Sequence, residues 1–226
     1  VAKLDDHVVV IDTGFTAPVA AARQREFLRC PVETLSLLGI LPEDVDDVVL
    51  THLHYDHSGN FDRFPKATFH LQEDELQYAT GKYMRYPRLA HSFEVDDVCG
   101  IVKMNYAGRV LFYDGDDNLN SSIRLHRCGG HSAGLQFVSV NTARGWLVLA
   151  SDATHYYENM NAYRPFTTAF HIGEMMECFD QLKRVAPSED HIIPGHDPLV
   201  MKRYPALSGQ EGVIVRLDVP PASELA

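Results

Sequence analysis

The stretch His52-Leu53-His54-Tyr55-Asp56-His57-Ser58-Gly59-Asn60 directly follows the sequence DVVLT at residues 47–51, which predicts a strand. In an extended segment, residues two apart point the same way, so His52 and His54 can share one cation. Asp56 and His57 would then turn toward a second cation from a loop that ends at Ser58 and Gly59. Imidazole and carboxylate ligands without thiolate suit Zn²⁺, and also Fe or Mn. This stretch therefore predicts a metal-binding loop at a strand end.

Three later motifs supply further ligands, and each follows a predicted strand. His131 lies in Gly129-Gly130-His131-Ser132, Asp152 follows the strand pattern LVLAS at residues 147–151, and His196 lies in Pro194-Gly195-His196-Asp197. Loops at strand ends are where such scaffolds gather functional sites, and flanking glycines let the backbone bring imidazoles close together. Two metal sites are therefore expected from His52, His54, Asp56, His57, His131, Asp152 and His196.

Composition excludes several classes of protein. The chain has 226 residues, of which 45% are apolar and 23% charged, as in an ordinary globular protein. Its net charge of −11 disfavours nucleic acid as a partner. The four cysteines lack C-x-x-C spacing, so we expect reduced, buried thiols. No apolar run approaches the 18 residues that span a membrane, so we expect no membrane contact and a cytoplasmic location.

Hydrophobic patterns predict an α/β chain with one domain over residues 1–226. Because the chain begins at Val1 rather than Met, we leave open that a leader or a first strand has been removed. A helical insert is expected at residues 72–108 and would wall the site. Expected strands cover residues 8–11, 47–51, 67–71, 110–113, 122–126, 135–140, 146–150 and 190–194, and expected helices cover residues 35–40, 73–80 and 172–185. Two acidic clusters, at residues 44–47 and 114–117, predict solvated turns.

The four motifs HLHYDH, GGHS, SDA and PGHD, in this order, resemble the metallo-β-lactamase superfamily from Val8 to about Tyr204. The resemblance implies an αββα sandwich, with two packed β-sheets flanked by helices. It implies one metal ion held by His52, His54 and His131, a second held by Asp56, His57 and His196, and Asp152 as a bridge between them.

Within the superfamily, the chain most resembles the N-acyl homoserine lactonase group, through Ile11-Asp12-Thr13-Gly14, the Ser-Gly-Asn end of the metal loop and Ser151-Asp152-Ala153. It departs from that group at two positions. Leu135 stands where the group has a second His after the third motif, and His155, followed by Tyr156, stands where the group has a Tyr that polarises the lactone carbonyl. Either His155 or Tyr156 is the candidate for that role.

The implied activity is a quorum-quenching hydrolysis of a neutral lactone with an apolar tail, by a hydroxide that bridges two divalent ions. Asp56 or Asp152 would accept the proton of the attacking water and pass it to the leaving oxygen. Asp12 either orients a ligand or is a simple turn residue. Alternatives on the same fold are a thioesterase of the hydroxyacylglutathione hydrolase type and an iron-dependent oxidoreductase, and we allow for a homodimer.

The remaining histidines fit no ligand pattern, so we expect His70, His91, His126, His171 and His191 to be structural or surface residues. Aromatic and methionine side chains between Tyr78 and Tyr106 either line an acyl pocket or belong to the core. This group comprises Tyr78, Tyr83, Met84, Tyr86, Phe93, Met104 and Tyr106. The same two interpretations, acyl pocket or core, apply to Phe166 and Phe170.

Overall fold

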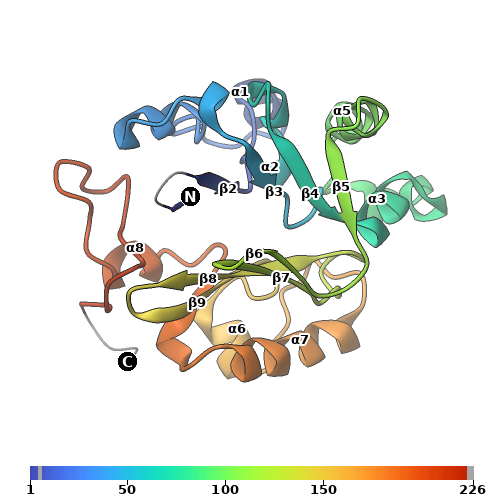
Figure 1. The fold of residues 1–226 in the computed structure, drawn as a ribbon. Coiled ribbons are helices and arrows are strands. Elements are labelled where there is room, and N and C mark those ends of the chain that lie inside the picture. Colours follow the sequence, from blue (N-terminus) through green and yellow to red (C-terminus); the bar gives the residue numbers. More distant parts are fainter. Residues whose placement is uncertain (5–6, 223–226) are drawn as a thin grey trace. The chain divides into compact units, whose positions relative to one another are not determined.

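A computed structural model describes residues 1–4 and 7–222, in two compact units, Val1–Asp114 and Gly115–Ala226. Each unit contains one five-stranded sheet with helices (Figure 1). The expected α/β class with two sheets and helices is confirmed, whereas the single domain over residues 1–226 stays a prediction. No helix in the described part of the chain is long and apolar enough to cross a membrane.

In the first unit, the sheet has the order β1-β2-β3-β4-β5, in which β1 is antiparallel and the others are parallel. Its strands are β1 (Ala2–Lys3), β2 (Val8–Ile11), β3 (Asp47–Val49), β4 (Thr68–Gln72) and β5 (Val110–Tyr113). Its α-helices are α1 (Ala17–Ala22), α2 (Tyr55–Ser58), α3 (Glu73–Thr80), α4 (Pro87–Ala90) and α5 (Val95–Tyr106), and its 3₁₀ helices are η1 (Glu33–Leu38), η2 (Pro42–Asp44), η3 (Phe61–Arg63) and η4 (Lys82–Arg85). The carboxyl ends of parallel strands lie at one edge of a sheet, so the turn after β2 and the metal loop after β3 start side by side.

In the second unit, the sheet has the order β10-β9-β8-β7-β6, with β10 parallel to β9 and the other pairs antiparallel. Its strands are β6 (Asp117–Asn120), β7 (Ile123–Arg127), β8 (Gln136–Thr142), β9 (Gly145–Ser151) and β10 (Ile192–Pro194). Its helices are α6 (Tyr157–Asn161), α7 (Ile172–Val185), η5 (Glu189–His191) and α8 (Leu199–Arg203). Figure 1 shows α6 and α7 along one face of this sheet.

The core of the second unit lies between its sheet and α7. Met175, Phe179 and Leu182 are buried on one face of α7, as its 3.6-residue apolar period predicts. Phe179 and Leu182 pack with Phe137 and with Leu135, which is fully buried. The position where the resembled lactonases carry a second His is therefore filled by an apolar core residue in this chain.

Several expectations about local structure are wrong. Asp117, expected at the end of a solvated turn, is instead the first residue of β6, because its backbone pairs with β7 although its side chain is exposed. The expected helix at residues 35–40 is the 3₁₀ helix η1, and β3 ends at Val49, two residues early. The cysteines are free thiols, as expected, but Cys99 is exposed because α5 turns Val98 and Ile101 inward instead.

Candidate metal centre

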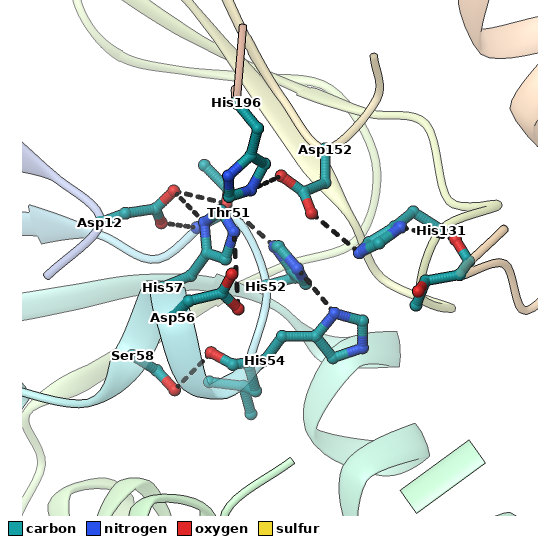
Figure 2. A network of polar contacts seen from close by, with 12 residues as sticks. Asp12, Thr51, His52, His54, Asp56, His57, Ser58, His131, Asp152 and His196 are labelled. Atoms are coloured by element: carbon teal, nitrogen blue, oxygen red, sulfur yellow. Dashed lines mark hydrogen bonds and ion pairs between the residues drawn. The ribbon is translucent and has the colours of Figure 1, made fainter. Parts of the chain in front are cut away.

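The metal loop of the first unit is partly helical. The expectation of a continuous loop through Gly59 is wrong, because α2 covers Tyr55–Ser58. The carbonyl of His54 accepts backbone hydrogen bonds from His57 and Ser58, which closes this turn. Asp56 and His57 are thus presented by a helical turn, while His52 and His54 precede it in extended backbone (Figure 2).

His52 and His54 aim ring nitrogens at each other. Nε2 of His52 lies 3.0 Å from Nδ1 of His54, and both residues are buried. Two ligand atoms on one Zn²⁺, each about 2.1 Å away and about 90–109° apart, are about 3.0–3.4 Å from each other. The pair therefore has the separation of two ligands to one ion, as its i, i+2 spacing predicts.

A chain of hydrogen bonds sets the tautomer of His52. A carboxylate only accepts, so the hydroxyl of Thr51 donates to Oδ2 of Asp12 at 2.8 Å. Oγ1 of Thr51 must then accept from Nδ1 of His52, 3.1 Å away. The lone pair of His52 is consequently on Nε2, the atom that faces His54.

Asp12 also orients His57. Nδ1 of His57 donates to Oδ2 of Asp12 at 2.8 Å, which leaves the lone pair of the neutral ring on Nε2, the nitrogen available to a metal ion. Asp12 has a φ of 58°, a left-handed conformation that Asp tolerates better than most residues. Asp12 is expected either to orient a ligand or to be a simple turn residue, and its hydrogen bonds to His57 and Thr51 support the orienting role. Hydrogen-bonded partners of this kind fix the orientation of metal-binding histidines.

Glu75 is a supporting residue that the sequence patterns do not single out. It is fully buried on α3, and its Oε1 accepts a hydrogen bond from the backbone N–H of Leu53 at 2.9 Å. A buried carboxylate is costly unless it is hydrogen-bonded, so this contact holds the backbone between His52 and His54. Acidic residues are common in the first turn of a helix, so the sequence at residues 73–75 does not indicate this role of Glu75.

In the second unit, the carboxylate of Asp152 stands between two histidines (Figure 2). Its Oδ2 lies 3.0 Å from Nε2 of His131, and its Oδ1 lies 3.0 Å from Nε2 of His196. Asp152 and His131 are buried, whereas the His196 side chain is about one third exposed. Ser151, which precedes Asp152 at the end of β9, has a φ of 47°, and strained backbone of this kind clusters at functional sites.

Glycines next to His131 and His196 allow close packing of the backbone, against α7 for Gly130 and against Ser151 and Asp152 for Gly195. A Cβ on Gly195 would lie 2.7 Å from the carbonyl oxygen of Ser151 and 3.0 Å from Oδ1 of Asp152. A Cβ on Gly130, which has a φ of 85°, would lie 2.5 Å from the backbone nitrogen of Met175. The expectation that these glycines permit close approach is confirmed.

In the neutral form of His131, the position of its ring proton favours a cation between this ring and Asp152. Nδ1 of His131 lies 2.9 Å from the carbonyl oxygen of Thr168, so it carries a proton and donates. In the neutral ring, Nε2 then presents a lone pair to a carboxylate oxygen 3.0 Å away. Two acceptors at this distance repel each other unless positive charge lies between them, so the donor set fits a metal ion.

His155 and Tyr156, the two candidates for polarising a substrate carbonyl, lie in different surroundings. His155 is buried, its ring stacks on Phe166 with centroids 3.9 Å apart, and its Nε2 is 3.0 Å from Oδ2 of Asp152. Burial lowers the pKa of His155, against the opposing effect of Asp152. Tyr156, at the start of α6, is 37% exposed. Which of the two residues polarises a carbonyl stays a prediction.

The other histidines are structural or surface residues, as predicted. His70 and His126 are buried and hydrogen-bonded, to Asp47 and to Ser139 respectively. His91 and His171 are exposed, and His191 is partly buried. The prediction of a solvated turn is wrong for Asp47, because its two oxygens bind His7 and His70.

The aromatic group of the first unit divides into buried and exposed members. Three aromatic rings form a row that starts at His54. The ring centroids are 4.7 Å apart for His54 and Phe93, 5.7 Å for Phe93 and Tyr78, and 6.2 Å for Tyr78 and Tyr83. Phe93 and Tyr78 are buried and Tyr83 is 37% exposed, so this row adjoins a candidate ligand at one end and solvent at the other. Tyr106 is 90% exposed and belongs to neither a core nor this row.

A family model described as the metallo-β-lactamase superfamily matches residues 1–196. Among curated proteins, the N-acyl homoserine lactonase of Bacillus cereus is 29% identical over 168 residues, 74% of this chain and 61% of the relative. The N-acyl homoserine lactonase AttM of Azorhizobium caulinodans is 30% identical over 185 residues, 74% of this chain and 64% of the relative. The chain thus spans about three fifths of the length of these relatives.

Solved structures share the fold. One is an N-acyl homoserine lactone hydrolase with the product N-hexanoyl-L-homoserine bound at the catalytic metal center, which matches with a TM-score of 0.72 and 21% identity over 88% of this chain and 80% of that one. Another, the hydrolase AbOPH of the beta lactamase superfamily, matches with a TM-score of 0.68 and 21% identity over 86% of this chain and 70% of that one. These matches confirm the expected αββα fold class.

Proposed function

Because this chain belongs to the metallo-β-lactamase superfamily, we propose that it is a metal-dependent hydrolase that uses two divalent ions, most simply Zn²⁺, to open the ester of a lactone. The proposed ligands to one ion are His52, His54 and His131, and those to the other are Asp56, His57 and His196. Asp152 is proposed as a ligand to both. The relatives named as lactonases motivate the substrate.

The observation that carries the proposal is the two-sided carboxylate of Asp152. Its two oxygens each lie 3.0 Å from a different imidazole nitrogen, of His131 on one side and of His196 on the other. A carboxylate that only served one ion, or that only capped a histidine, would not need both oxygens engaged in this way. This two-sided placement supports the proposal that Asp152 is a ligand shared by two cations.

Divalent ions held by these residues would supply a water of lowered pKa and would polarise an ester carbonyl. The chain's own residues would do the remaining work. Asp12 holds His57 with its Nε2 unprotonated, and Thr51 does the same for His52. Asp56 or Asp152 would accept the proton of the attacking water and return it to the leaving oxygen. Tyr156, which is partly exposed, is the proposed donor to the substrate carbonyl.

A neutral lactone with an apolar tail, of the N-acyl homoserine lactone type, fits the surroundings of His54. The row formed by Phe93, Tyr78 and Tyr83 offers an apolar wall that begins next to His54, the proposed metal ligand. Each CH₂ of an acyl chain buried there contributes up to about 0.8 kcal/mol, or about fourfold in kcat/KM. We therefore expect activity to rise with chain length and then level off.

A glutathione thioester fits less well. It carries two carboxylates, which require convergent cations, and the chain has a net charge of −11. The only adjacent basic pair after His196 is Lys202 and Arg203. Arg203 is buried and pairs with Asp190 at 2.5 Å, so its charge already has a partner.

The test compares kcat/KM for butanoyl, octanoyl and dodecanoyl homoserine lactones with values for S-lactoylglutathione and a β-lactam, on enzyme loaded with Zn²⁺. The expected result is a preference for the lactones, with octanoyl above butanoyl. Replacing Tyr156 by Phe should lower kcat by up to 10²–10³-fold, the range for one lost oxyanion donor. A thioester preferred tenfold over every lactone would overturn the substrate assignment.

A further inference from the structure

We infer that His155 is an additional metal ligand, which binds through Nε2 the ion on the Oδ2 side of Asp152. The inference rests on the proposed metal-dependent function and concerns residues of the second unit alone. The resembled lactonases usually have Tyr at this position, so the inference assigns this chain a nitrogen donor that the seven-ligand pattern does not include.

Distances support a common ion. One donor atom from each of His131, Asp152 and His155 lies within 4.8 Å of the others. Nε2 of His131 and Nε2 of His155 are each 3.0 Å from the same carboxylate oxygen, Oδ2 of Asp152. Ligands about 2.1 Å from one ion are about 3.0–3.4 Å apart at angles near 90–109°, so all three atoms can reach a single ion.

Protonation favours a ligand over a hydrogen-bond donor. The carbonyl of Thr168 fixes the proton of neutral His131 on Nδ1, so positive charge is favoured between Nε2 of His131 and Oδ2 of Asp152. If His155 donated an Nε2 proton to the same oxygen, that proton would be directed at the cation. With the lone pair on Nε2 instead, this nitrogen of His155 is attracted to the cation.

The packing of the ring holds Nε2 in place. Phe166 stacks on His155 at an interplanar angle of 16°, and His155 is only 5% exposed. Its Nδ1 is buried and has no hydrogen-bond partner among the described residues, so Nε2 is the anchored end of the ring. A buried imidazole whose Nε2 contacts a carboxylate, with a donor nitrogen of a second imidazole within 4.8 Å, has the surroundings of a ligand.

The test uses Co²⁺ as the probe, with wild type, His155→Phe, His155→Tyr and, as a control, His91→Phe. His91 is exposed on the first unit, so His91→Phe removes an imidazole far from any proposed ligand in sequence. Two measurements are made: Co²⁺ affinity by chelator competition, and the number of hyperfine-shifted imidazole N–H signals in the proton NMR spectrum. Each Co²⁺-bound histidine that keeps a ring proton contributes one such signal.

We expect His155→Phe and His155→Tyr each to lose one shifted N–H signal. We expect His155→Phe to bind one of two Co²⁺ ions at least tenfold more weakly, with His155→Tyr closer to wild type because phenolate is also a donor. His91→Phe should match wild type in both measurements. If His155→Phe does not fold, as judged by circular dichroism, His155→Gln replaces it with a smaller polar side chain.

Three outcomes would overturn the inference. In the first, affinity in His155→Phe stays within twofold of wild type and every shifted signal remains. In the second, affinity falls but the number of shifted signals is unchanged, which makes His155 a positioning residue that acts through Asp152. In the third, wild type binds no Co²⁺, which overturns the proposed function as well. Wild type that binds two ions and opens lactones keeps the proposed function whatever His155 does.

Discussion

The Oδ2 atom of Asp12 lies 2.8 Å from Nδ1 of His57, so a carboxylate in the turn after β2 orients a candidate ligand in the helix after β3. The same carboxylate accepts hydrogen bonds from the backbone N–H and the hydroxyl of Thr51. One side chain thereby sets the ring orientation of His57 directly and that of His52 through Thr51.

Replacing Asp12 by Ala should weaken metal binding about 10–100-fold, the usual effect of removing a hydrogen-bonded partner of a metal-binding histidine. Asp12→Asn should fall between Ala and wild type, because Asn tolerates the left-handed backbone and keeps one acceptor oxygen. Affinity is measured by competition with a chromophoric chelator. Asp44→Ala, in an exposed turn, is the control, and equal affinity in Asp12→Ala and wild type would refute this role.

Replacing Glu75 by Ala should destabilise the first unit by about 1–3 kcal/mol, because the N–H of Leu53 loses its acceptor in a buried environment. Urea unfolding of the metal-free protein, followed by circular dichroism, measures this change. Glu73→Ala, in the same helical turn but exposed, should change the free energy of unfolding by less than about 0.5 kcal/mol. Similar losses in the two variants would show that the contact with Leu53 is unimportant.

The contribution of Asp47 to the free energy of unfolding should depend on pH. Hydrogen bonds and charge from His70 and His7 lower the pKa of Asp47 below its usual value of 3.8, against the opposing effect of burial. Since the folded pKa is below the unfolded one, the ionised carboxylate stabilises the fold fully above about pH 5. This contribution is lost as the pH falls through the lowered pKa.

Asp47→Asn should therefore be less stable than wild type at pH 7, by about 1–3 kcal/mol, and the difference should shrink between pH 5 and pH 3. Urea unfolding at a series of pH values measures it. Asp46→Asn is the matched control, because the Asp46 side chain is 65% exposed and lies 3.9 Å from His7. A difference between Asp47→Asn and wild type that is independent of pH would contradict the lowered pKa.

Much of this architecture follows from sequence patterns. The apolar period of residues 172–185 predicts α7 at its observed bounds, and the helix expected at residues 73–80 is α3. The ligand motifs are readable because imidazole and carboxylate side chains recur directly after strand patterns. The glycines beside His131 and His196 can be predicted to matter because they too directly follow strand patterns.

What the patterns do not show depends on contacts between distant residues. Asp47 looks like part of an acidic turn until β4 brings His70 beside it, and Glu75 looks like an ordinary helix start. The tautomer of His131 depends on a backbone carbonyl 37 residues away, at Thr168, which no side-chain pattern encodes. The strand β6 is held by backbone pairing despite polar side chains.

The number of divalent ions bound per chain tests the central claim most directly. We predict that protein loaded with Zn²⁺ and dialysed retains two equivalents by plasma mass spectrometry, and that Asp152→Ala retains at most one because it loses the ligand shared by both ions. Removal of the metal with a chelator should abolish lactone hydrolysis, and Zn²⁺ should restore it. Two retained equivalents with full hydrolysis in Asp152→Ala, or wild-type activity that survives complete metal removal, would contradict the account.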